Sequence, residues 1–107
     1  MKHRLKVFHS KFAERKLRLL LDYIESEWGS KSKSSFFSKY SKSIEQISTH
    51  PRSCPESEYK SGLFKCVVTK QTSVLYRINE DSVEIITLFD NRQNQNEVFE
   101  EIKNYFA

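Results

Sequence analysis

The spacing of apolar residues changes along this chain of 107 residues, and each spacing predicts a different kind of element. Between residues 11 and 28, apolar side chains recur every three or four positions, as in an amphipathic helix. The members of this stripe are Ala13, Leu17, Leu20, Leu21, Ile24 and Trp28. Ser10 can cap the first turn and Gly29 can end the last one, so we predict a helix over 11–28.

A second helical stripe begins almost at once, with Ser30 as its opening residue. Its members are Phe36, Phe37, Tyr40, Ile44 and Ile47. The segment is otherwise rich in Ser and Lys, so burial of the stripe rather than intrinsic propensity must stabilise it. His50 precedes Pro51 and therefore leaves the helical region, which ends this helix near Thr49. Two helices with so short a link fold back on each other as an antiparallel hairpin.

Beyond Gly62 the pattern becomes that of strands. Three apolar, β-rich runs cover 63–69, 73–78 and 83–89, and turn-forming residues separate them. Short connections of this kind make antiparallel neighbours, so we predict a three-stranded meander. A polar loop over 51–61 precedes the meander, and the tail over 95–106 has the spacing of a short helix. Alternation at 4–8 predicts a first strand, which we expect at one edge of the sheet.

The order β-α-α-β-β-β-α predicts an α+β fold in which a helical hairpin covers one face of a twisted antiparallel sheet. A chain of this length is expected to form one domain over 1–107. In the strand 73–78, Val74, Tyr76 and Ile78 share the more apolar face, which the hairpin should cover. Leu75 and Arg77 then point to a face that we expect to be open.

Composition excludes several classes of function. There are 18 Lys and Arg against 14 Asp and Glu, a net charge of +4 that suits either an ordinary surface or an acidic partner. Cys54 and Cys66 lack metal-site spacing, and His3, His9 and His50 are scattered, so we expect reduced thiols and no metal or other cofactor. No apolar run approaches the ~20 residues of a membrane span, and no apolar leader is evident at the N-terminus. We therefore expect a cytoplasmic protein without membrane contact.

Five short segments, in the same order along the chain, resemble the RelE/ParE superfamily of type II toxin–antitoxin toxins. They are Trp28-Gly29, Ile47 with His50-Pro51, Gly62 to Lys65, Val74-Leu75-Tyr76-Arg77-Ile78, and Ile85-Ile86 with the stretch from Phe89 to Asn94. The resemblance covers nearly the whole chain. It implies the same fold as the element order predicts, and a toxin neutralised by a cognate antitoxin.

Within this superfamily, RelE-like members cleave mRNA on the ribosome and ParE-like members inhibit DNA gyrase. RelE-type nucleases use two lysines at alternate positions of one strand, an arginine on the next strand, another after the last strand and a tyrosine near the C-terminus. Such groups activate the 2′-hydroxyl, neutralise the phosphate and protonate the leaving oxygen. Here Lys65 and Arg92 match, whereas Val67, Ser73 and Val98 or Phe99 occupy the other positions. Nucleases that use Glu and His are also poorly matched, since no His follows His50.

The resemblance therefore implies a ParE-like, non-enzymatic toxin that binds DNA gyrase and is neutralised by an acidic antitoxin that orders on binding. The expected partner contacts are Arg77, Arg92, Phe99, Tyr105 and Phe106. One alternative is a ribosome-dependent mRNA interferase that uses Lys65, Arg77 and Arg92, and another is an inactive toxin that still binds its antitoxin or operator. Structural interpretations also stay open, in which Arg77 pairs with Glu84, Arg92 anchors the turn at Asp90, and the aromatic tail packs in the core.

Overall fold

The computed structural model describes residues 4–107. Its elements follow the predicted order, which is thereby confirmed: β1 (Lys6–His9), α1 (Lys11–Trp28), α2 (Ser30–Thr49), β2 (Leu63–Val67), β3 (Thr72–Ile78), β4 (Ser82–Asp90) and α3 (Gln95–Tyr105). Both hairpin helices have the predicted bounds, whereas strand ends shift, so that β2 stops at Val67 rather than at residue 69. The Ser10 hydroxyl accepts a hydrogen bond from the Ala13 N–H at 2.9 Å, and is thus the predicted cap of α1.

The strands form one sheet in the order β1-β4-β3-β2. The predicted meander of β2, β3 and β4 is antiparallel, and β1 lies at an edge as expected. However, β1 pairs with β4 in parallel, with Val7 opposite Val83, so the sheet is mixed rather than wholly antiparallel. Tight turns impose the antiparallel direction on the meander. Along the chain, two helices and two further strands separate β1 from β4, so no turn sets the direction of β1 relative to β4.

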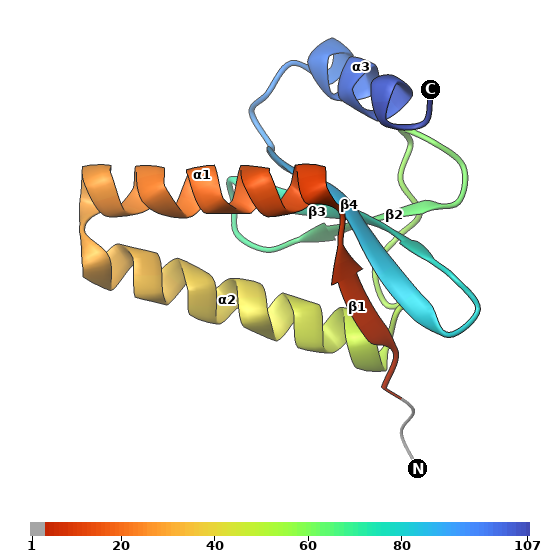
Figure 1. Ribbon diagram of the computed structural model, residues 1–107, viewed down its shortest axis with the longest axis horizontal. Helices are drawn as coiled ribbons and strands as arrows, with labels where there is room; N and C mark the ends of the chain where they lie inside the picture. The colour runs from red at the N-terminus through yellow and green to blue at the C-terminus, as the bar shows by residue number, and fades with distance from the viewer. Residues whose placement is uncertain (1–3) are drawn as a thin grey trace.

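The hairpin of α1 and α2 covers one face of the sheet, as predicted (Figure 1). Val74, Tyr76 and Ile85 point into this interface and are fully buried, together with Ala13 of α1 and Ile47 of α2. The face assignment for β3 is therefore correct. None of the helices in residues 4–107 is long and apolar enough to cross a membrane.

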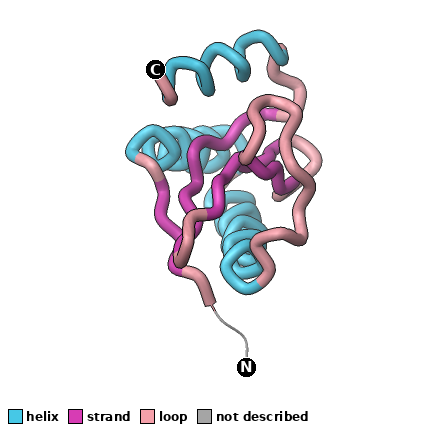
Figure 2. Tube along the Cα trace, turned by 90° about the vertical axis from the view of Figure 1, so that its right-hand side faces the viewer, coloured by secondary structure: helices cyan, strands magenta, loops and turns pink. Residues whose placement is uncertain are grey.

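The other face of the sheet is covered in part by α3, so it is not open as expected. Val98 and Ile102 of α3 pack against Leu75, Ile86 and Phe89, all of them buried. Figure 2 shows strands between α3 at the top and α2 at the bottom, with α1 beside them. The β3–β4 pairing is irregular between Leu75 and Tyr76, and across this irregularity Ile85 and Leu88 both lie beneath the hairpin, whereas Ile86 and Phe89 both face α3. The second face is apolar enough to bind a helix.

A histidine at the end of β1 predicts how stability depends on pH. The Nε2 atom of His9 lies 2.7 Å from the Tyr40 hydroxyl, and burial lowers the pKa of His9 below its ordinary value of 6.5. Because the folded state favours neutral His9, the unfolded chain binds more protons below that value, and stability falls as the pH drops. We expect the urea midpoint to fall between about pH 7.5 and about pH 5.5, above the range where carboxylates titrate.

The His9→Gln variant should lose most of this dependence, whereas His50→Gln, at the exposed end of α2, should keep it. An unchanged pH profile in His9→Gln would show that another group controls stability in this range.

Candidate functional site

The predicted site residues fall into two groups in the structure. Lys65, Arg77, Phe99, Tyr105 and Phe106 belong to the sheet face that carries α3, where several of them contact one another or their neighbours. Arg92 instead follows the end of β4, where it lines a groove together with residues of α1 and α2.

Glu84 joins two of the predicted residues. Arg77 lies opposite Glu84 in the β3–β4 pair, and its Nη2 atom is 2.7 Å from Oε1 of that carboxylate. The Tyr105 hydroxyl donates to the other oxygen, Oε2, at 2.8 Å. Burial, and then the hydrogen bond to Glu84, raises the pKa of Tyr105, so its hydroxyl stays a proton donor. This contact links the end of α3 to the central strands.

Phe106 is covered by two cations of its own chain. Nζ of Lys60 lies 5.0 Å from the centroid of its ring, and Cζ of Arg77 lies 5.6 Å from it. Both distances suit a cation–π attraction, and Phe106 is half-buried. No second chain is needed to shield this ring. Lys60 is not among the predicted site residues. Its one signal in the sequence is that it follows an aromatic residue, Tyr59, in an otherwise polar loop.

Phe99 belongs to an aromatic cluster next to this network. Its ring lies 4.8 Å, centroid to centroid, from Tyr59, which in turn lies 5.6 Å from Phe89. Nζ of Lys65 lies 5.6 Å from the centroid of the Phe89 ring. Phe99 itself is 41% exposed and Val67, two residues beyond Lys65 on β2, is 59% exposed. An apolar surface therefore stays accessible beside Lys65.

Each of the three cations proposed for RNA cleavage is engaged by a different group: Lys65 by the Phe89 ring, Arg77 by Glu84 and Arg92 by Asp90. Ser73, at the position of a nuclease arginine, is fully buried and donates from Oγ to Oδ1 of Asn91 at 2.6 Å.

Arg92 and Asp90 form an ion pair at the rim of the groove, with Nη2 and Oδ2 2.9 Å apart. Hydrogen bonds from Arg92 hold the pKa of Asp90 below its usual range, and the Arg92 side chain is 74% exposed. The structural interpretation, in which Arg92 anchors the turn at Asp90, is therefore correct. The turn leaves most of the guanidinium accessible.

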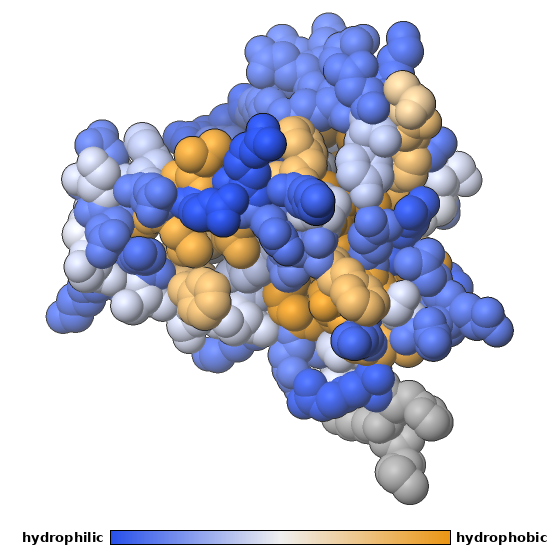
Figure 3. Space-filling model, viewed as in Figure 1, coloured by the Kyte–Doolittle hydropathy of each residue, from blue (hydrophilic) through white to orange (hydrophobic). Residues whose placement is uncertain are grey.

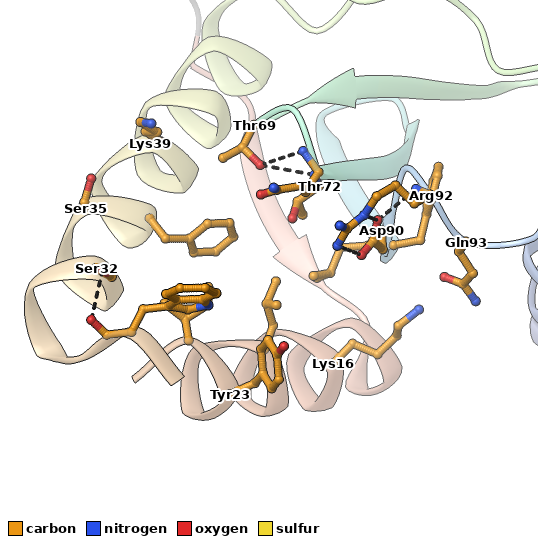
Figure 4. A pocket seen from close by; sticks show the side chains of 17 residues that line it. Lys16, Tyr23, Ser32, Ser35, Lys39, Thr69, Thr72, Asp90, Arg92 and Gln93 are labelled. Carbon is orange, nitrogen blue, oxygen red and sulfur yellow. Dashed lines mark hydrogen bonds and ion pairs between the residues drawn. The ribbon is translucent and has the colours of Figure 1, made fainter. Parts of the chain in front are cut away.

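The groove has a volume of about 580 Å³ and runs between the helical hairpin and the end of β4. Figure 4 shows Lys16 and Tyr23 on α1, Ser32, Ser35 and Lys39 on α2, and the pair of Asp90 and Arg92 at the end of the sheet. Trp28, which ends α1, also lines it. This concave surface is not apparent from the sequence, because it forms where the hairpin projects beyond the strands (Figure 1).

Cys54 and Cys66 are free and buried in the core beneath the hairpin. Burial raises the pKa of the Cys66 thiol to about 12, so it is a poor nucleophile. Within residues 4–107, no three side chains of His, Cys, Asp or Glu are grouped so that they could hold a metal ion.

Comparison with known proteins gives matches by structure only. No family model matches the sequence, and no curated protein is similar enough in sequence to count as a relative. Among solved structures, a chain of the chromosomal ParDE toxin–antitoxin system from P. aeruginosa superposes with a TM-score of 0.70 at 10% identity, over 82% of this chain and 97% of that one.

Two further structures are similar. The YoeB dimer from Staphylococcus aureus gives a TM-score of 0.57 at 12% identity, over 80% of this chain and 95% of that one. The RelBE2 toxin–antitoxin complex from Mycobacterium tuberculosis gives 0.50 at 18% identity, over 84% and 94%. The fold that the resemblance implies is thus confirmed, since over at least 80% of its length this chain has the fold seen in the ParDE, YoeB and RelBE2 structures.

Proposed function

We propose that this protein is the toxin of a type II toxin–antitoxin pair, and that it acts by binding DNA gyrase rather than by cleaving RNA. The shared fold supports the toxin assignment. The observation that carries the choice of mechanism is that Glu84 binds both Arg77 and the Tyr105 hydroxyl, while Arg92 lies apart from them at the groove.

The chemistry of RNA cleavage explains why this observation favours binding. A nuclease must neutralise a phosphate in the transition state and supply a proton to the leaving oxygen. Here the Glu84 carboxylate lies beside Arg77 on the sheet face, where it repels a phosphate. The same carboxylate accepts the hydrogen bond of the Tyr105 hydroxyl, which is then not free to serve as an acid. Val67 and Ser73 offer no replacement cation.

Two of the predicted contact residues are accessible for a target protein. Phe99 is 41% exposed and the side chain of Arg92 is 74% exposed, and exposed aromatic and arginine side chains are common among residues that dominate binding energy. Arg77, Tyr105 and Phe106 contribute, in this proposal, by holding α3 in place, so that Phe99 is presented at a fixed position.

An acidic antitoxin is the proposed neutralising partner, and the protein acts with it in the cytoplasm. The net charge of +4 would speed the encounter with an acidic chain. On the face shown in Figure 3, hydrophobic residues emerge along the seam between α1 and α2 and over β1. Phe8 of β1 is 47% exposed and Phe37 of α2 is 49% exposed. A segment that orders on binding would gain by burying such side chains.

Supercoiling and DNA-cleavage assays with purified gyrase test the proposed target. We expect the purified protein to inhibit supercoiling, and the Phe99→Ala and Arg92→Ala variants to need about tenfold more protein, as for residues central to an interface. Matched controls are Leu19→Ala and Arg18→Ala, which remove an exposed apolar and an exposed basic side chain from α1. These should inhibit like the parent protein.

Unchanged gyrase activity at protein levels that stop growth would rule out this target. Primer extension on mRNA from induced cells identifies the mRNA interferase instead, if cleavage within codons occurs and disappears with Arg92→Ala. Expression that does not slow growth would indicate a toxin retained only for binding its antitoxin.

A further inference from the structure

The groove between the hairpin and the end of β4 carries two aromatic rings that the proposed function does not use. Tyr23 is 57% exposed and Trp28 is 70% exposed, and both line the groove from α1. Large aromatic side chains are normally covered, because each has a large apolar area to bury. Two of them left open in one concave surface are suited to a ligand with flat, stackable faces.

The groove is also positively charged. Three cations line it, namely Lys16, Lys39 and Arg92, against the single carboxylate of Asp90. Lys16 is held by Glu101 at 3.0 Å and Arg92 by Asp90 at 2.9 Å, whereas none of the ion pairs found in residues 4–107 involves Lys39. The positive charge in the groove that no carboxylate neutralises therefore comes from Lys39 of α2.

Helix α2 extends this positive charge beyond the groove. Between Ser30 and Ile44 it carries four lysines and no acidic residue, and Lys31, Lys39 and Lys42 are exposed. The fourth, Lys33, is paired with Glu25 at 3.2 Å. A row of lysines without carboxylates attracts a polyanion, because each bound phosphate releases a condensed counterion.

Neutral side chains with hydrogen-bonding groups also line the groove. They are Ser32, Ser35, Thr69, Gln71, Thr72 and Gln93. Hydroxyl and amide groups of this kind bind phosphate and sugar oxygens. Five apolar side chains also line the groove, but three of them are buried (Phe36, Leu88 and Phe89) and two are half-buried (Leu20 and Ile24). They therefore expose little of the continuous apolar wall that the hydrophobic face of an acidic amphipathic peptide helix needs. The mixture of exposed rings, hydroxyls and lysines therefore favours a nucleic acid over a peptide.

We propose that this groove binds single-stranded nucleic acid, with bases stacked on Tyr23 and Trp28 and the backbone held by Lys39 and the exposed lysines of α2. Stacking on aromatic side chains combined with a basic track for the backbone is how proteins bind single strands without sequence preference. Paired bases of a duplex do not offer free faces to the rings, so single strands bind more tightly. The site does not include Glu84 or Phe99, and its function does not depend on gyrase as the target.

Trp28 makes the proposal directly testable, because it is the only tryptophan of the chain and its fluorescence reports on the groove. The probes are fluorescein-labelled oligothymidylate and oligouridylate of about 12 nucleotides, at about 50 mM salt. We expect saturable quenching of Trp28 and a matching rise in probe anisotropy. Tyr23→Ala should weaken binding about tenfold, through loss of one stacking platform.

Charge is tested separately. Lys39→Ala should weaken binding about threefold and reduce the slope of log K against log salt by about 0.7, the value for one phosphate contact on a single strand. Leu19→Ala is the control for Tyr23→Ala, since Leu19 is 61% exposed on the same helix but does not line the groove. Lys11→Ala, an exposed cation at the start of α1, is the control for Lys39→Ala.

Three results would overturn the proposal: no saturable quenching, equal weakening by the control variants, or a duplex that binds as tightly as the single strand. Displacement of the oligonucleotide by a polyglutamate peptide at equal charge would identify the groove as a site for acidic peptides. None of these assays measures gyrase inhibition. A negative result would therefore not count against gyrase as the target, which the supercoiling assay tests separately.

Discussion

The Ile85→Ala variant will unfold with a free energy about 3 kcal/mol lower than the parent protein. Ile85 is fully buried in β4, opposite His9 of β1 on one side and Tyr76 of β3 on the other. Because both neighbouring strands are held by backbone pairing, the site cannot collapse to fill the space that the larger side chain leaves. The loss therefore combines the transfer energy of the removed atoms with the cost of a cavity.

Urea unfolding followed by circular dichroism measures this loss by linear extrapolation. Val67→Ala is the matched control, since Val67 is 59% exposed on β2, and it should change stability by no more than about 0.5 kcal/mol. A loss below about 1 kcal/mol for Ile85→Ala would mean that the hairpin does not pack tightly over the centre of the sheet.

A second substitution, Ile102→Ala, will release α3 while the hairpin side of the sheet stays folded. Ile102 is 3% exposed and packs with Val98 against the face that carries Leu75 and Ile86, and this cluster is separate from the one beneath α1 and α2. A loss of about 3 kcal/mol lowers the docked fraction of α3 relative to the undocked fraction by a factor of about 100. Val98, the Lys16–Glu101 ion pair and the hydrogen bond of Tyr105 to Glu84 are then left to hold the helix.

Native-state hydrogen exchange distinguishes this local release from global unfolding. In Ile102→Ala, amides of α3 should exchange faster by about the same factor of 100, while those of β3 and β4 keep their protection. Lys103→Ala, an exposed change on the same helix, should leave α3 protected. Faster exchange over the whole chain would show instead that α3 and the rest of the protein unfold as one cooperative unit.

The predicted site residues show where local patterns stop being informative. The sequence correctly suggests Glu84 as a partner for Arg77 and Asp90 for Arg92, because each pair is close along the chain or across one hairpin. Tyr105 on Glu84 and Lys60 on Phe106 are contacts between distant segments, and no periodicity indicates them. The groove at Tyr23 and Trp28 is missed for the same reason, since Trp28 fits the apolar stripe of α1 and yet is 70% exposed.

The sequence alone determined the bounds of α1 and α2, the antiparallel meander and the face of β3 beneath the hairpin, because stripes, caps and turns act over a few residues. Tertiary structure decided that β1 runs parallel to β4, that α3 covers the second face, and that the hairpin projects to form a groove. These features depend on which surfaces meet after the elements have formed. Burial of the apolar area that the separate elements still expose decides which surfaces meet, and the residues of those surfaces lie far apart in the chain.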